Sequence, residues 1–129
     1  MDNVELVKQG YKDFAEGNIE AVLAVFVPEF EWHGSVGFPY LEGDGVVVGA
    51  NEVAQKVFAQ IPSLYDNFSI DIQDIFESGD KVVMEGFYRG AWKATGKQFK
   101  ANAAHIWTVK EGKAIKCMQA VDTAEIMKP

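Results

Sequence analysis

The spacing of the apolar residues changes once along the chain, near Phe68. Before this point they recur at intervals typical of helices, and after it come four strand-like runs at residues 68–76, 81–94, 99–109 and 114–121. The segments between the runs, ESGD, TGKQ and KEGK, are turn-formers of hairpin length. Helices followed by an antiparallel meander predict an α+β fold, in which helices cover one face of a curved sheet.

Two amphipathic helices are expected at the start of the chain. Residues 3–16 carry apolar side chains on one face, and Gly17 ends this segment. Asn18 is a suitable N-cap for a second helix, and Pro28 prevents its continuation. The two segments together predict a helical hairpin.

The next part of the chain is less regular. EFEWHG at residues 29–34 predicts a short strand, and the glycine-rich residues 34–49 predict an irregular loop. Asn51 is the expected N-cap of a third helix, which ends before Pro62.

The composition bounds the class of protein. A chain of 129 residues with 48% apolar residues predicts one globular domain over residues 1–129, and no run approaches the roughly 20 apolar residues of a membrane span. The first residues, MDNVELVKQG, carry acid where a secretory signal needs base, so a cytoplasmic location is expected. The net charge of −7 argues against binding to nucleic acid or to an acidic membrane surface.

Metal, nucleotide and thiol chemistry are not indicated. The 2 histidines lack a metal-ligand spacing, and the glycines of residues 34–49 do not follow the phosphate-loop pattern. The single cysteine, Cys117, excludes an internal disulfide and is expected to be a small buried residue. We therefore expect neither a metal nor a cofactor.

Five strings together cover almost the whole chain: YKDFAEGNIEAVLAVFVPEFEW, GANEVAQKVF, SGDKVVMEG, TGKQFKANAAHIWTVKEGKAIK and VDTAEI. They resemble the NTF2-like superfamily, and within it the branch of ketosteroid isomerases and SnoaL-like polyketide cyclases. The resemblance implies a cone-shaped α+β barrel with an apolar pocket for a small hydrophobic molecule. It also implies a homodimer formed through the outer face of the sheet.

Enzymes of this branch place a general base in an apolar pocket, with a hydrogen-bond donor for a developing enolate oxygen. Counted from the Gly17–Asn18 pair, Trp32 stands where ketosteroid isomerases place the base aspartate. Gly10, next to Tyr11, stands where they place the oxyanion tyrosine. The resemblance therefore does not extend to ketosteroid isomerisation by the known mechanism.

SnoaL-type cyclases carry a histidine in an AHIWTV-like strand and an aspartate near the end of the next strand, which correspond to His105 and Asp122. These two residues are the candidate acid/base pair. In a hairpin that turns within KEGK, however, His105 faces about residues 116–118, so direct contact with Asp122 is not implied. Asp122 also begins a capping-box pattern, DTAEI, so helix capping is its alternative role. For His105 the alternative is a core histidine bonded to the backbone.

Strand parity and bulk select the other candidate pocket residues. His105 and Trp107 share one strand face, so they line the pocket together or not at all. Only one of Trp32 and His33 can point inward, and bulk favours Trp32. Core packing is the alternative for the aromatic candidates. The candidate ligand-binding residues are Tyr11, Phe14, Trp32, His33, Phe38, Tyr40, Phe58, Tyr65, Met84, Tyr88, Trp107, Met118 and Gln119.

One further polar pair interrupts an apolar strand. Glu85 and Arg89 are expected on one strand face as a structural ion pair, unless Gly86 marks a bulge. A buried Glu85 would instead be a candidate base with a raised pKa.

The sequence thus predicts a protein with a pocket for a small, mainly hydrophobic molecule. If it is an enzyme, we expect a cofactor-free cyclase, isomerase or dehydratase that removes a proton next to a carbonyl group. The alternative is a non-catalytic ligand-binding or sensing module of the same fold.

Overall fold

The computed structural model describes residues 2–127. The helical elements are α1 (Asn3–Ala15), α2 (Ile19–Ala24), α3 (Ala50–Val53), the π-helical turn η1 (Ala54–Phe58), α4 (Gln60–Leu64) and α5 (Thr123–Ile126). The strands are β1 (Phe26–His33), β2 (Val46–Val48), β3 (Tyr65–Ser78), β4 (Lys81–Trp92), β5 (Gln98–Lys110) and β6 (Lys113–Val121).

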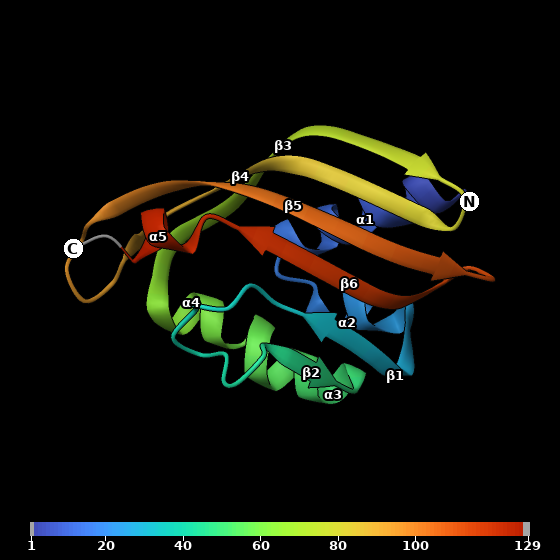
Figure 1. The fold of residues 1–129 in the computed structure, drawn as a ribbon, viewed down its shortest axis with the longest axis horizontal. Helices are drawn as coiled ribbons and strands as arrows, with labels where there is room; N and C mark the ends of the chain where they lie inside the picture. The colour runs from blue at the N-terminus through green and yellow to red at the C-terminus, as the bar shows by residue number, and fades with distance from the viewer. Residues whose placement is uncertain (1, 128–129) are drawn as a thin grey trace.

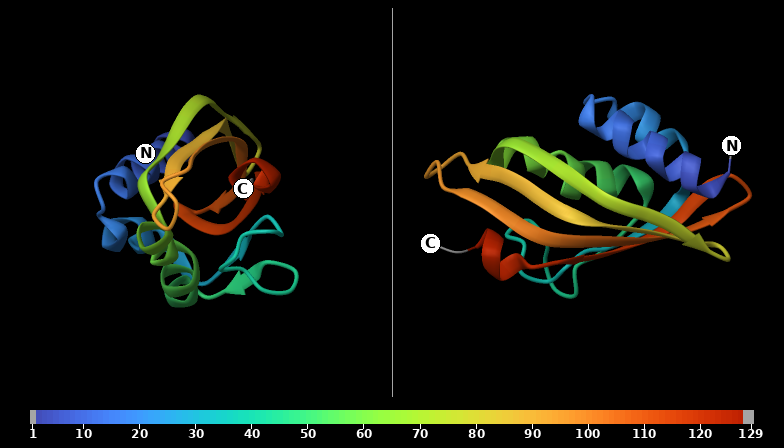
Figure 2. Two further views of the ribbon diagram at one scale, coloured as in Figure 1. Left: turned by 90° about the vertical axis from the view of Figure 1, so that its left-hand side faces the viewer. Right: turned by 90° about the horizontal axis from the view of Figure 1, so that it is seen from above.

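The strands form one 6-stranded sheet in the order β2-β1-β6-β5-β4-β3 (Figure 1). β1 pairs with β6 in parallel, and the other neighbours are antiparallel. The sheet is strongly curved, and α1 to α4 lie on its open side (Figure 2). The predicted α+β class and curved sheet are confirmed, although the sheet stays open instead of closing into a barrel.

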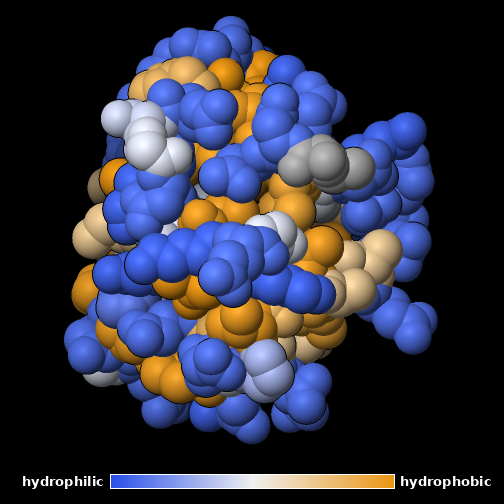
Figure 3. Space-filling view, turned by 90° about the vertical axis from the view of Figure 1, so that its right-hand side faces the viewer, coloured by the Kyte–Doolittle hydropathy of each residue, from blue (hydrophilic) through white to orange (hydrophobic). Residues whose placement is uncertain are grey.

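Two clusters of buried side chains hold the helices against the sheet. The larger one joins Val7 and Tyr11 of α1 to Phe30 and Trp32 of β1 and to Trp107 of β5. The smaller one lies toward the other end of the sheet and contains Phe38, Tyr65, Tyr88, Phe99, Ala101, Ala103 and Ile126. Figure 3 shows the end of the molecule that carries the β3–β4 and β5–β6 turns, where hydrophilic residues surround scattered apolar ones.

The first two helices follow the sequence prediction, with one difference in length. Asn18 caps α2 as expected, because its Oδ1 accepts a hydrogen bond from the Ala21 N–H at 3.3 Å. The helix ends at Ala24, however, and Phe26 already belongs to β1. Pairing with β6 begins at Phe26, opposite Ala114, and the Ala114 N–H donates to the Val25 backbone oxygen, so the chain joins the sheet before Pro28 is reached.

Three predictions for residues 34–62 were wrong. The third helix is capped by Gly49, at a φ of 104° and without a side-chain bond, and not by Asn51. The helix also does not end before Pro62, which lies inside α4, following the π-helical turn η1. In addition, the predicted loop contains a strand, β2, which pairs with β1.

The register of the β5–β6 hairpin decides what faces His105. Its turn falls at Glu111 and Gly112, which have φ values of 52° and 75° and thus match the expected tight turn. A register shift between Thr108 and Val109 then places His105 opposite Gln119 and not opposite residues 116–118. The sequence offers no glycine or proline that would have marked this irregularity.

The described residues contain no helix that is long and apolar enough to cross a membrane.

Candidate functional site

A cavity of about 60 Å³ lies between the helices and the inner face of the sheet. Polar groups enter it from α1, β1, β4, β5 and β6, whereas most of its wall is apolar. The lining residues are Leu6, Val7, Gly10, Tyr11, Phe14, Val22, Val25, Phe26, Trp32, Tyr40, Val57, Phe58, Ile61, Phe68, Ile70, Tyr88, His105, Trp107, Ala114 and Gln119.

His105 is at the centre of the polar groups, and it is only 2% exposed. Its Nδ1 is hydrogen-bonded to the Tyr11 hydroxyl at 2.7 Å, and its Nε2 is hydrogen-bonded to the Tyr88 hydroxyl. We call these three residues the Tyr–His–Tyr cluster. His105 therefore meets two titratable side chains and is not a core histidine bonded to the backbone.

Two further side chains donate to the Tyr–His–Tyr cluster from its ends. The Trp107 Nε1–H donates to the Tyr11 oxygen at 2.8 Å. The Gln119 Nε2–H donates to the Tyr88 oxygen at 2.7 Å. Each tyrosine oxygen is thus already an acceptor before its bond to His105 is counted.

Ser35 fixes the orientation of Gln119. The Ser35 backbone N–H donates to Gln119 Oε1 at 3.1 Å, and the Ser35 hydroxyl donates to the Gln119 backbone oxygen at 3.0 Å. The same hydroxyl accepts from the Val121 N–H at 2.8 Å. Because Oε1 is held by Ser35, the amide nitrogen of Gln119 is the atom that faces Tyr88.

Burial keeps the whole cluster uncharged. It lowers the pKa of His105 to about 3, so the imidazole is neutral at physiological pH. Burial also raises the pKa of Tyr11 and Tyr88 well above 10, so both phenols keep their protons. No carboxylate or ammonium group is among the lining residues.

The indole N–H of Trp32 is a second polar feature of the cavity wall. Trp32 is 4% exposed, and its Nε1 has no hydrogen-bond partner among the described residues. Its ring meets that of His105 edge-on, with centroids 5.8 Å apart. Since buried donors normally have a partner, this N–H is an unsatisfied donor of a wall residue, and it lies next to Gly34.

The structure divides the candidate ligand-binding residues into three groups, at the cavity wall, in the core and on the outer face of the sheet. Those at the cavity wall are Tyr11, Phe14, Trp32, Tyr40, Phe58, Tyr88, Trp107 and Gln119. Phe38 and Tyr65 instead pack in the smaller core cluster, and Met84 is fully buried in the larger one.

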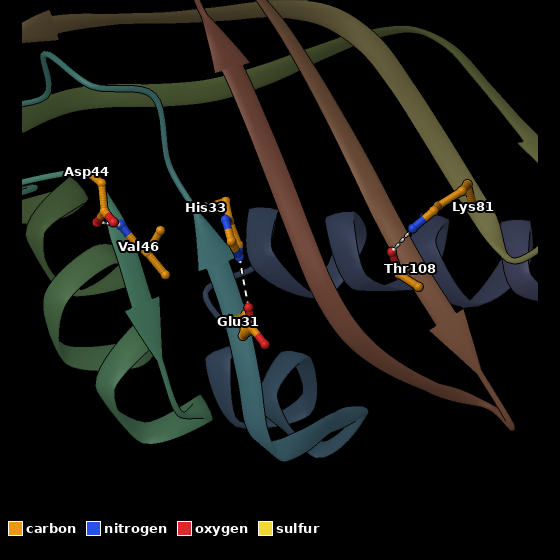
Figure 4. A network of polar contacts seen from close by, with 6 residues as sticks. All are labelled: Glu31, His33, Asp44, Val46, Lys81 and Thr108. Atoms are coloured by element: carbon orange, nitrogen blue, oxygen red, sulfur yellow. Dashed lines mark hydrogen bonds and ion pairs between the residues drawn. The ribbon is translucent and has the colours of Figure 1, made fainter.

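Two candidates lie on the outer face of the sheet. His33 is paired with Glu31 at 2.9 Å on this face (Figure 4). Met118 is 50% exposed and lies opposite His33 in the parallel β1–β6 pairing. Neither side chain lines the cavity, because strand neighbours of inward-facing Trp32 and Gln119 must point outward.

Asp122 is not brought to His105. It is the N-cap of α5, and its Oδ1 accepts from the Glu125 backbone N–H at 3.4 Å. The structure therefore gives Asp122 the capping role that its sequence context suggested, and it lies outside the cavity lining.

The expected Glu85–Arg89 ion pair is not the one that forms. Arg89 Nε lies 3.2 Å from Asp71 Oδ2 on the neighbouring strand, and Glu85 is exposed and so is not a buried base. Gly86 marks a bulge, but the extra residue is in β3, where the register shifts between Ile72 and Asp74. A Cβ at Gly86 would lie 2.1 Å from the Asp71 backbone oxygen, so only glycine fits.

Tyr11, Phe14 and Phe58 of the helical wall were predicted from the sequence, whereas its other members and the role of Ser35 were not. The apolar stripe of residues 3–16 could have indicated Val7 and Gly10, which lie one turn from Tyr11 and Phe14. No local signal predicts that Tyr11 and His105 meet. Among the described residues, no cluster of three or more His, Cys, Asp or Glu side chains could hold a metal ion.

The model of the SnoaL-like domain family matches residues 7–116. An NTF2-like protein from Burkholderia thailandensis is similar in structure, with a TM-score of 0.89, 29% identity, and 98% and 97% of the two chains covered. An NTF2-like protein of unknown function from Burkholderia pseudomallei has a TM-score of 0.87 and 24% identity over 99% and 97%. A candidate SnoaL-like polyketide cyclase from Jannaschia sp. CCS1 has a TM-score of 0.81 and 17% identity over 98% and 92%. Comparison with curated proteins gave no match.

The curved sheet and its helical cover are therefore an NTF2-like fold, which these solved structures share. Within that fold, the chain belongs to the SnoaL-like domain family.

Proposed function

We propose that the cavity binds a small, mainly hydrophobic molecule through an acceptor oxygen such as a carbonyl, and that the Tyr–His–Tyr cluster supports cofactor-free proton transfer on it. The observation that carries this proposal is the burial of neutral His105 between two phenolic hydroxyls in an otherwise apolar wall. Donors fixed in a water-poor site stabilise negative charge that develops on an oxygen. A cyclase, isomerase or dehydratase reaction next to a carbonyl develops charge of this kind.

The polar groups of the cavity favour an acceptor over a donor or a cation. The Trp32 indole can only donate, and each tyrosine oxygen already accepts from Trp107 or Gln119. A ligand amine or ammonium would therefore meet few acceptors. A ligand oxygen, in contrast, would meet unpaired donors.

The volume of the cavity bears on the size of the ligand. A dry protein cavity that binds benzene has about 150 Å³, whereas this one has about 60 Å³. Binding of even a single ring therefore requires lining side chains to move. We expect a compact ligand, with rearrangement of aromatic side chains such as Phe58 and Tyr40 at the wall.

A non-catalytic binding module is the second candidate. Both ring nitrogens of His105 are engaged, its pKa is lowered to about 3, and no carboxylate lines the cavity, so no strong base is present. The two functions share the cavity and its donors. They differ in whether the bound compound is converted.

We also propose that the chain forms a homodimer through the outer face of the sheet. Phe76, Val83, Ile106 and Met118 lie directly opposite one another on neighbouring strands β3 to β6. Three of them are large and exposed, at 46%, 38% and 50% for Phe76, Ile106 and Met118. A continuous exposed apolar row of this kind favours contact with another protein surface.

A ligand screen tests the proposed function. Native mass spectrometry and thermal-shift measurements would compare small cyclic ketones and enones with hydrocarbons of the same shape. We expect the carbonyl compounds to bind more tightly than the hydrocarbons, both in wild type and in the surface control His33→Gln. Conversion of a bound compound would identify an enzyme, and binding without conversion would identify a binding module. Equal binding of ketones and hydrocarbons would contradict the proposal.

A further inference from the structure

The Tyr–His–Tyr cluster holds one more proton than its own hydrogen bonds use. The Tyr11 hydroxyl, the neutral His105 ring and the Tyr88 hydroxyl each carry one proton. Two hydrogen bonds join them, Tyr11 to Nδ1 and Tyr88 to Nε2, and each bond uses one proton. One proton is therefore left without an acceptor inside the cluster.

The neighbours of the cluster determine where this proton can be. Trp107 donates to the Tyr11 oxygen and Gln119 donates to the Tyr88 oxygen, so neither neighbour takes the proton. If Nδ1 carries the ring proton, it donates to Tyr11, and the Tyr11 O–H is free. If Nε2 carries it, the Tyr88 O–H is free. The spare proton is always on a tyrosine hydroxyl, and the tautomer of His105 decides whether that hydroxyl belongs to Tyr11 or to Tyr88.

We propose that His105 is a tautomer relay, which moves one free hydroxyl donor between Tyr11 and Tyr88 on the two sides of its ring. This inference rests on the proposed function, because Tyr11, Tyr88 and His105 all line the proposed ligand cavity. A ligand oxygen at Tyr11 selects the Nδ1–H tautomer, and one at Tyr88 selects the Nε2–H tautomer. His105 thus acts through the tyrosines as a positioning residue.

The relay also gives a proton-transfer step that balances. Starting from Nδ1–H, the Tyr11 proton passes to the ligand oxygen and the Nδ1 proton passes to Tyr11. The Tyr88 proton passes to Nε2, and a ligand proton passes to the Tyr88 oxygen. Four bonds to hydrogen break and four form, so the ligand is tautomerised and the cluster ends as Nε2–H.

No member of the cluster is charged at the start or the end of this step. Charge on a buried phenol or imidazole is costly without a partner of opposite sign, and none lines the cavity. The starting tautomer returns after product release, when water takes a proton from Tyr88 and gives one to Tyr11. The relay therefore needs no carboxylate base.

Nitrogen-15 NMR of labelled histidine tests the relay without a ligand or turnover. The His33→Gln background leaves His105 as the single histidine signal, and each ring nitrogen reports whether it carries a proton. In Tyr11→Phe the ring proton can pair only with Tyr88, so we expect Nε2–H. In Tyr88→Phe it can pair only with Tyr11, so we expect Nδ1–H. The tautomer ratio should move about tenfold or more in opposite directions, because an unpaired buried N–H is costly.

The same tautomer in both variants, or a doubly protonated ring at pH 7, would overturn the relay. Gln119→Met is a milder variant in case either phenylalanine variant does not fold. Loss of the Gln119 donor leaves room at the Tyr88 oxygen, so the Nε2–H share should rise over wild type, and an unchanged or lower share would also overturn the relay. Because no ligand is involved, failure here is distinct from failure of the ligand screen.

Discussion

Removing the Tyr11 hydroxyl tests the hydrogen bonding of the buried cluster most simply. Tyr11→Phe leaves the Trp107 N–H and one ring nitrogen of His105 without their partner, and these residues are 8% and 2% exposed. A buried polar group that loses its partner costs about 1–3 kcal/mol. After partial relaxation, we expect the free energy of unfolding to fall by about 2–4 kcal/mol.

Tyr65→Phe is the matched control. Tyr65 is 3% exposed, and its hydroxyl is buried without a hydrogen-bond partner among the described residues. Its removal relieves an unpaired group, so the free energy of unfolding should stay unchanged or rise by about 1 kcal/mol. Urea denaturation measures both variants, and equal m values would show that the comparison is valid. If Tyr11→Phe cost no more than Tyr65→Phe, the cluster would not be bonded as described.

Three further predictions follow from the buried histidine, the helix cap and the outer face. Unfolded His105 protonates below about pH 6.5, whereas burial lowers the pKa of folded His105 to about 3. As the pH is lowered from about 6.5 to about 3, the free energy of unfolding should therefore fall by on the order of 4 kcal/mol. It should fall less steeply in His105→Gln, and equal slopes for the two proteins would contradict this prediction. Asp122→Ala should lower the free energy of unfolding by about 1 kcal/mol and leave ligand affinity unchanged. A loss of ligand affinity with no loss of stability would instead assign Asp122 a functional role. Met118→Glu should shift a dimer toward monomer in light scattering, whereas Val36→Glu, at an exposed loop residue, should not; a dimer unaffected by Met118→Glu would place the interface elsewhere.

The fold was predictable because its signals are local. Asn18 at a helix start and Gly112 in a two-residue turn each act within a few residues, and the structure uses both as expected. The errors arose where longer-range packing decided the outcome. Asn51 is a suitable cap in isolation. However, β2 pairs with β1 as far as Val48, and the helix begins directly after it, with Gly49 as its N-cap.

The candidate site was predictable only in part. Parity placed His105 and Trp107 on one face, and both line the cavity. The partners of His105 could not be predicted, since Tyr11 lies 94 residues away in sequence and Tyr88 lies 17 residues away. The β5–β6 register shift brings Gln119 opposite His105, and no residue type at the shift indicates it in the sequence.

The central claim is that the buried donors of the cavity recognise an acceptor oxygen. The most direct measurement is the affinity of wild type for 2-cyclopenten-1-one and for cyclopentene, by calorimetry or ligand-detected NMR, with His33→Gln as the surface control. We predict that both proteins prefer the ketone by about tenfold or more, as expected for a buried hydrogen bond. Equal affinity of wild type for the ketone and the hydrocarbon would contradict the account.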